Sequence, residues 1–226
     1  MNSKLIGRGL VVSCQALEHE PLHGSHHMVA MARAARQSGA IGIRANGTAD
    51  IRAIKTEIGL PVIGLVKRET AGFEVYITPT VEAALEVHRA GADIVAIDGT
   101  SRPRPDGLPL ADVLKRLKQA GVRVMADIST YEEGLRAADW GADYVSTTLC
   151  GYTRETQETE LPNLDLVGRL ADALTVPVVA EGGIYEPSQA VEALRRGAAF
   201  VVVGSAITRP QWITERYTSA IRTYGA

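Results

Sequence analysis

The chain has 226 residues, of which 46% are hydrophobic and 22% are charged, and its formal net charge is −2. This length and apolar content predict a globular domain with a substantial core. Acidic and basic residues are interspersed along the whole chain, which argues against nucleic acid or an anionic membrane as a partner. No apolar run reaches the ~20 residues of a transmembrane helix, and the first residues do not resemble a signal peptide.

The two cysteines, Cys14 and Cys150, lie far apart and form no CxxC pair. Two such residues do not predict a disulfide framework, and they fit a reducing compartment. We therefore expect a soluble, unprocessed cytoplasmic protein.

One motif occurs four times along the chain, and each copy contains the end of a helix, a glycine and a β-branched apolar run. The glycines are Gly39, Gly91, Gly141 and Gly197. Each can adopt the left-handed conformation that ends a helix, so that a buried strand can follow it. Other strands are predicted after a proline or a lone glycine. In chain order, the eight predicted strands lie within 9–15, 37–44, 60–67, 89–98, 121–127, 139–148, 176–183 and 195–204.

These strands are nearly continuous apolar runs, which is typical of parallel strands covered on both faces. Segments with helical spacing lie between them, at 26–37, 48–58, 80–89, 110–119, 131–139, 164–174, 188–195 and 211–222. Thr78 followed by Pro79 resembles an N-cap with proline at the first helical position, and Pro187 and Pro210 are predicted near the starts of later helices.

Eight strands that alternate with eight helices predict a single-domain (β/α)8 barrel, or TIM barrel. The alternative is a doubly wound open sheet. That fold usually has fewer strands and a glycine-rich phosphate turn after the first one, whereas Ser13, Cys14 and Gln15 end the first strand here.

Polar residues end most of the predicted strands, at the face where a barrel carries its active site. They are Gln15, Arg44, Lys67, Asp98, Asp127, Thr147 with Thr148, Glu181, and Gly204 with Ser205. Five charged groups at one mouth are expected to pair and to shift one another's pKa values. Asp98 has an equally good alternative as a turn-forming acid in the GTSRPRP loop.

Lys67 follows a run of Val, Ile, Leu and Val, so partial desolvation should lower its pKa. It is a candidate acid or base, or a candidate Schiff-base nucleophile. The residue pattern leaves both chemistries open.

The stretch VVAEGGIY places Glu181 at the end of a buried strand and directly before Gly182 and Gly183. Together with Gly204 and Ser205 after the eighth strand, these glycines can present backbone amides to a ligand. The loops after strands seven and eight commonly bind phosphate in barrels, and Arg209 adds a guanidinium suited to phosphate oxygens. We therefore predict a phosphate pocket there.

Four histidines cluster in HEPLHGSHH, at positions 19–27. Adjacent histidines on a helix point in different directions, and the ligand spacing of a closed metal site is absent. We therefore predict a solvated loop and no metal.

Arg102 and Arg104 form a rigid basic loop with their prolines. This loop is predicted either to reach substrate or to be exposed.

The chain resembles the bacterial N-acetylmannosamine-6-phosphate 2-epimerases of sialic acid catabolism over nearly its whole length. The matching segments are SCQALEHEPLHG, IRANG, GLVKR, VYITPT, AIDGTSRPRP, MADISTYEEG, STTLCGYT and VAEGGIYEP. The resemblance implies a barrel of the ribulose-phosphate-binding type and the interconversion of the 6-phosphates of N-acetylmannosamine and N-acetylglucosamine. It also implies an enzyme without a redox cofactor, and a homodimer.

The resemblance further implies roles for individual residues. Lys67 and Glu181 would transfer the C2 proton through an enediolate, and which of them faces which side of C2 stays open. Gln15, Arg44 and Asp127 would bind the sugar hydroxyls or the N-acetyl group. Arg209 and the backbone at Gly182, Gly183, Gly204 and Ser205 would bind the phosphate.

Two other functions remain as alternatives. One is a phosphate-binding lyase, aldolase or synthase with a Schiff-base lysine at position 67, and the other is a non-catalytic sugar-phosphate-binding protein.

The last predicted helix carries Trp212, Ile213, Tyr217 and Ile221 at helical spacing. Such a stripe more often packs on its own barrel than on a partner.

Overall fold

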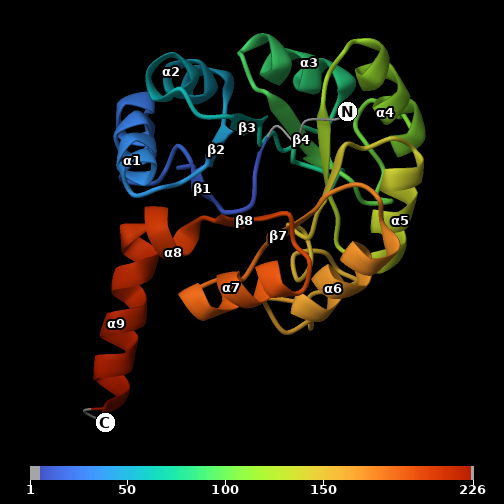
Figure 1. The fold of residues 1–226 in the computed structure, drawn as a ribbon. Coiled ribbons are helices and arrows are strands. Elements are labelled where there is room, and N and C mark those ends of the chain that lie inside the picture. The colour runs from blue at the N-terminus through green and yellow to red at the C-terminus, as the bar shows by residue number, and fades with distance from the viewer. Residues whose placement is uncertain (1–5, 225–226) are drawn as a thin grey trace.

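Eight parallel strands close into a barrel in the computed structural model, which describes residues 6–224 (Figure 1). The strands follow one another around the barrel in chain order, and β8 pairs with β1. Their bounds are β1 Leu10–Cys14, β2 Gly42–Asn46, β3 Val62–Leu65, β4 Ile94–Asp98, β5 Val124–Asp127, β6 Tyr144–Ser146, β7 Val178–Glu181 and β8 Phe200–Val203. The predicted (β/α)8 barrel is confirmed, and closure excludes the open sheet.

A helix follows each strand, and the first seven helices pack on the outside of the barrel (Figure 1). The helices are α1 Ser25–Gln37, α2 Thr48–Ile58, α3 Val81–Arg89, α4 Leu110–Gln119, α5 Tyr131–Asp139, α6 Leu164–Ala173, α7 Pro187–Arg195, α8 Ser205–Thr208 and α9 Pro210–Tyr224. The short α8 is an addition to the prediction. Within residues 6–224, no helix combines the length and the apolar character needed to cross a bilayer.

The helix boundaries confirm most of the predicted signals. Gly39, Gly91, Gly141 and Gly197 have φ between +91° and +104°, each one residue after a helix cap. Pro187 and Pro210 begin α7 and α9. The prediction for Thr78 is wrong, because Thr80 is the N-cap of α3 and accepts a hydrogen bond from Ala83 N at 3.1 Å.

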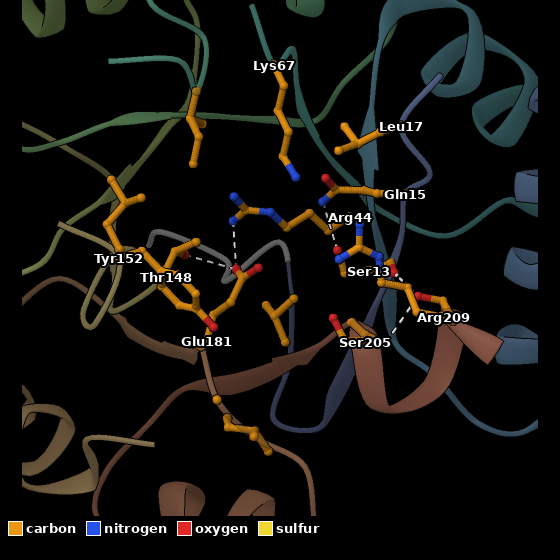
Figure 2. Close-up of a pocket in the computed structure, with 18 of the residues that line it drawn as sticks. Ser13, Gln15, Leu17, Arg44, Lys67, Thr148, Tyr152, Glu181, Ser205 and Arg209 are labelled. Carbon is orange, nitrogen blue, oxygen red and sulfur yellow. Dashed lines mark hydrogen bonds and ion pairs between the residues drawn. The ribbon is translucent and has the colours of Figure 1, made fainter. Parts of the chain in front are cut away.

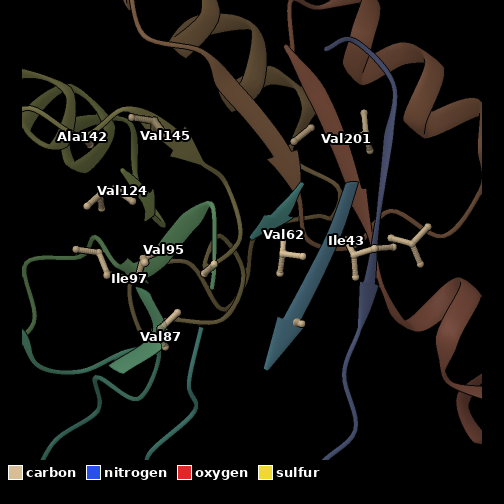
Figure 3. Close-up of a cluster of buried hydrophobic side chains, with 14 of the residues drawn as sticks. Ile43, Val62, Val87, Val95, Ile97, Val124, Ala142, Val145 and Val201 are labelled. Atoms are coloured by element: carbon tan, nitrogen blue, oxygen red, sulfur yellow. The ribbon is translucent and has the colours of Figure 1, made fainter. Parts of the chain in front are cut away.

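Side chains alternate between two apolar cores along the strands. Figure 3 shows part of the larger core, in which Ile43, Val95 and Val145 point outward from their strands among the helices. The smaller core fills the barrel interior and includes Ile63 and Phe200. Because both faces of each strand are covered in this way, the strands read as continuous apolar runs in the sequence.

The interior becomes polar toward the carboxyl ends of the strands. Ser13 lies beside Arg44 in the register of β1 and β2, and Asp98 lies beside Asp127 in that of β4 and β5. Arg44 is the third residue of β2, so its prediction as a strand end is wrong. Its inward direction buries the side chain to 1% exposure beneath the barrel mouth.

Candidate active site

A cavity of about 210 Å³ opens at the carboxyl ends of the strands (Figure 2). Nearly all of the predicted site lines it: Gln15, Arg44, Lys67, Glu181, Gly182, Gly183, Gly204, Ser205 and Arg209. Asp127 is the exception, since it is completely buried behind this lining. The cavity has a charged part around Arg44 and a glycine-rich part around Arg209. We call them the reaction end and the phosphate end, after the roles that the sequence predicts for them.

Arg44 organises the reaction end by pairing with two carboxylates. Its Nη2 donates to Asp127 Oδ2 at 2.6 Å, and its Nη1 donates to Asp127 Oδ1 at 3.2 Å and to Glu181 Oε2 at 2.7 Å. The Arg44 and Asp127 side chains are 1% and 0% exposed, and that of Glu181 is 13% exposed. Asp127 therefore holds the guanidinium from behind, while Glu181 meets both the guanidinium and the cavity.

Thr148, which follows β6, contacts both carboxylates of this cluster. Its hydroxyl lies 2.9 Å from Asp127 Oδ1 and 3.1 Å from Glu181 Oε2, and Ser146 Oγ is 2.8 Å away. A hydroxyl has a single hydrogen to donate, so Thr148 serves one carboxylate at a time. Among residues 6–224, no group donates to Glu181 Oε1, so the second oxygen of this carboxylate is available to a ligand.

Lys67 enters the cavity from the side opposite Glu181 and lies two residues after the end of β3 (Figure 2). Its backbone is fixed because Lys67 N donates to Asn46 Oδ1 at 2.8 Å. The side chain is exposed to the open cavity, but the surrounding walls lower the pKa of Lys67 through desolvation. The positive charges of Arg44 and Arg209 lower this pKa further, whereas Glu181 and Glu20 oppose the shift.

Glu181 has the opposite shift. Burial and the charge of Asp127 together raise the pKa of the Glu181 carboxyl to about 7, against the opposing effect of Arg44. A lysine with a lowered pKa and a glutamate with a raised pKa thus face one cavity. A lowered lysine pKa and a raised glutamate pKa are the directions of shift that favour general acid–base chemistry.

Gln15 follows β1 and carries a polar atom without a partner. Its Nε2 donates to Ser13 Oγ at 2.8 Å, which fixes the amide plane. Its Oε1 is buried and accepts no hydrogen bond from the described residues. A buried acceptor without a donor is costly, so this oxygen is suited to a ligand hydroxyl or amide N–H.

The phosphate end is built mainly from backbone. Gly182 and Gly183 have φ of +104° and +68°, which L side chains rarely adopt. A Cβ at Gly183 would lie 2.3 Å from Leu161 Cβ, so this turn is also closely packed. Ser205 begins α8 after Gly204, and Arg209 pairs with Glu20 through Nη2 at 2.7 Å.

Several other predicted polar residues lie elsewhere. Asp98 is buried and accepts from Thr100 N at 2.9 Å and from Arg102 Nη2 at 2.7 Å, so it orders its own loop, as the turn interpretation predicts. Neither Arg102 nor Arg104 lines the cavity, and Arg104 is buried, so the prediction that this loop reaches substrate or is exposed is wrong for Arg104. Among residues 6–224, no three potential metal ligands come together, and His19, His23 and His26 are exposed.

The prediction did not assign site roles to several residues of the cavity. Ser13, Glu20, Tyr76, Thr148 and Tyr152 line it as well. Thr148 had a sequence signal, since it follows a predicted strand. Glu20 and Tyr152 lie in loops, where strand periodicity indicates nothing about direction.

Comparison with known proteins identifies the family. Residues 28–223 match the family model described as "Putative N-acetylmannosamine-6-phosphate epimerase". The chain belongs to this family. A relative from Caldanaerobacter subterraneus, named "Putative N-acetylmannosamine-6-phosphate 2-epimerase", is 54% identical over 95% of this chain and 91% of its own length. A relative of the same name from Clostridioides difficile is 48% identical over 98% of this chain and 99% of its own.

Solved structures agree with this assignment. The N-acetylmannosamine-6-phosphate 2-epimerase from Clostridium perfringens superposes with a TM-score of 0.92 and is 44% identical, covering 96% of this chain and 94% of its own. A thiamine phosphate pyrophosphorylase from Pyrococcus furiosus superposes with a TM-score of 0.58 at 21% identity, covering 89% and 87% of the two chains. This second similarity shows only that the two proteins share a fold.

Proposed function

We propose that the protein is an epimerase that interconverts N-acetylmannosamine 6-phosphate and N-acetylglucosamine 6-phosphate. One observation carries this proposal beyond family membership. Lys67 and Glu181 enter the same cavity from opposite sides, with the Arg44 guanidinium between them (Figure 2). Inversion at a carbon needs one group to remove a proton from one face and another to supply a proton on the opposite face.

In the proposed reaction, the open-chain sugar lies with C2 between Lys67 and Glu181. One of them removes the C2 proton, and the electron pair moves toward the C1 carbonyl to form an enolate. The other returns a proton to the opposite face of C2, and the reverse reaction exchanges their roles. We assign the transfer at Glu181 to Oε1, because Oε2 is held by Arg44 and Thr148.

Arg44 supports both groups in this scheme. Its positive charge favours the carboxylate form of Glu181 and the neutral amine of Lys67, and it favours negative charge that develops beside it. Asp127 keeps the guanidinium in place from behind, so we assign it the positioning of Arg44 instead of a direct contact with the sugar. We assign the unpartnered Gln15 Oε1 to a hydroxyl or the N-acetyl N–H of the substrate.

The phosphate is assigned to the other end of the cavity. The amides of Gly183, Gly204 and Ser205 and the guanidinium of Arg209 are the candidate donors, and the positive φ of Gly182 and Gly183 turns the backbone there. Proton transfer at C2 gains and loses no electrons, so the proposed reaction requires no redox cofactor. We also propose that this activity serves sialic acid and amino-sugar catabolism in the cytoplasm.

The test is epimerisation of N-acetylmannosamine 6-phosphate in deuterium oxide, followed by NMR. We expect N-acetylglucosamine 6-phosphate that carries deuterium at C2, because the proton on Lys67 or Glu181 exchanges with solvent. Lys67→Ala should still bind the sugar phosphate but turn it over at a small fraction of the wild-type rate. Product that retains its original C2 hydrogen would contradict the two-base scheme.

The lowered pKa of Lys67 also favours a second candidate function, a lyase or aldolase that forms a Schiff base with a carbonyl substrate. Borohydride reduction distinguishes the two. Trapping of the sugar phosphate on Lys67, detected by mass spectrometry of the modified peptide, would favour the Schiff base. The proton-transfer scheme predicts an unmodified lysine.

We also propose that the protein is a homodimer in which a second copy covers the far half of α9. Trp212 stacks on Tyr185 of its own barrel with ring centroids 4.6 Å apart, but Tyr217 and Ile221 are 70% and 68% exposed. The expectation that the whole stripe packs on its own barrel is therefore wrong for its second half, which extends away from the barrel (Figure 1). Light scattering should give twice the monomer mass, and Ile221→Glu should reduce it.

A further inference from the structure

Glu20 lies in the β1–α1 loop, within the HEPLHG segment to which the proposed reaction assigns no role. Its side chain is 8% exposed and lines the cavity at the phosphate end. A buried carboxylate on a loop is unusual, because carboxylates are rarely buried unless they are paired. Its partners therefore indicate what it does.

Both oxygens of Glu20 are fully engaged. Oε2 accepts a hydrogen bond from Leu17 N at 2.7 Å, which fixes the carboxylate on its own loop. Oε1 lies 2.7 Å from Arg209 Nη2 and also accepts from Gln211 Nε2 at 2.7 Å. Glu20 thus joins the loop after β1 to Arg209, which lies between α8 and α9, and to Gln211 in the first turn of α9.

Few groups other than Glu20 restrict the position of the Arg209 side chain. Among residues 6–224, Glu20 is the only ion-pair or hydrogen-bond partner of its guanidinium, and the Arg209 side chain is 36% exposed. The residue lies between a four-residue helix and α9, so its backbone alone does not fix the direction of so long a side chain. A guanidinium has five donor N–H groups, and the ion pair through Nη2 leaves others for the cavity.

We propose that Glu20 is a positioning residue, which holds the Arg209 guanidinium toward the phosphate group of the substrate. An arginine fixed before the ligand arrives binds more tightly, because the side-chain entropy has already been lost. Glu20 therefore determines how strongly the enzyme prefers phosphorylated over unphosphorylated sugars. This inference rests on the proposed function for the identity of the sugar, but not for the anion.

Electrostatic repulsion between Glu20 and the phosphate would act in the opposite direction, and this difference gives the proposal its test. A carboxylate near the phosphate site would repel a phosphate dianion and weaken binding if positioning did not outweigh repulsion. Neutralising Glu20 then strengthens phosphate binding. The sign of the change therefore separates the two roles.

The experiment compares wild type, Glu20→Gln and the control Glu18→Gln. The control removes the same charge from an exposed residue of the same loop. A glutamine at position 20 can still accept the bond from Leu17 N, and equal melting temperatures would verify folding. We measure KM and kcat for N-acetylmannosamine 6-phosphate, and the Kd of inorganic phosphate by calorimetry.

We expect Glu20→Gln to raise both KM and the phosphate Kd about tenfold, since charge-assisted bonds are the strong ones, while kcat changes less than about twofold. Glu18→Gln should leave all three unchanged. In an Arg209→Ala background, Glu20→Gln should have little further effect, because its partner is gone. This background also decides the question if the single variant is unstable.

An unchanged or lower phosphate Kd in Glu20→Gln, or additive effects with Arg209→Ala, would overturn the positioning role. A fall in kcat at constant KM would do the same. If wild type does not convert the sugar phosphate, the proposed function fails, but the phosphate measurements still decide the role of Glu20.

Discussion

The two ends of the cavity are built by different means. The reaction end uses long charged side chains from β2, β5 and β7, which are buried and bonded to one another through Arg44. The phosphate end uses glycine backbone after β7 and β8, together with one arginine that is held from a loop. The first arrangement shifts pKa values, whereas the second provides donors to an anion. Substitutions at the reaction end should therefore lower kcat, whereas substitutions at the phosphate end should weaken ligand binding.

The largest effect is expected from Glu181→Gln at the reaction end. Glutamine can still accept from Arg44 and Thr148, but it cannot transfer a proton, so kcat should fall by a factor of about 10² to 10⁴. KM should change by less than a few fold. Steady-state kinetics check this, with Glu186→Gln as a control on the exposed surface. A variant with near-normal kcat would remove Glu181 from proton transfer.

The second prediction concerns stability. Asp127→Ala removes one of the two carboxylate partners of an arginine that is 1% exposed and leaves Glu181 as the other. The loss of two buried charge-assisted hydrogen bonds should lower the free energy of unfolding by about 3 kcal/mol. Arg209→Ala removes a partly exposed ion pair and should lower it by less than about 1 kcal/mol, while raising KM. Urea denaturation measures both. Equal losses would show that the two ends do not differ in this respect.

The third prediction compares two glycines of the phosphate end. Gly183→Ala places a Cβ 2.3 Å from Leu161 Cβ at φ +68°, so it should destabilise the protein by about 2 kcal/mol and weaken phosphate binding. Gly204→Ala is the matched control. Its φ is negative, at −112°, but its ψ of −90° lies outside the regions that L residues favour, and its Cβ would lie 3.3 Å from Ser13 Cβ. We therefore expect a smaller loss, of about 1 kcal/mol. Thermal unfolding gives the order, and the reverse order would contradict the geometry.

The sequence predicted the barrel well because its signals are local. Glycines such as Gly91 adopt the positive φ that ends a helix, and this preference does not depend on distant residues. Apolar runs such as IVAI likewise form buried strands in a parallel sheet that is covered on both faces. The residues that line the cavity from strand ends were largely predictable as well, since strand ends face the barrel mouth. Local patterns could place Lys67 and Glu181 at that mouth for this reason.

Depth below the mouth was not predictable, because it depends on register between strands. Arg44 lies inside β2 beside Ser13, and Asp127 lies behind it, so one is a deep wall of the cavity and the other does not line it. Glu20 was missed for another reason. Its role arises from a loop meeting the segment after β8, and no periodicity records such a contact.

The smallest predicted effect tests how tightly the reaction end is coupled. Thr148 donates toward Glu181 Oε2, and this bond lowers the pKa of Glu181 against the larger effect of burial. Thr148→Val keeps the shape but removes the hydroxyl, so the carboxylate form loses a donor and the pKa should rise from about 7. A rise of about one unit corresponds to the loss of one hydrogen bond to a charged group.

The sign of the pH effect follows from this shift. Where Glu181 acts as the base it must be ionised, so the limb of the kcat/KM profile that reports Glu181 should move to higher pH in Thr148→Val. Thr148→Ser retains the hydroxyl and should follow wild type. Carbon-13 NMR of labelled glutamate measures the same pKa without turnover. If Thr148→Val titrates like wild type in both measurements, the hydroxyl serves Asp127 alone, and the two carboxylates of the reaction end are linked only through Arg44.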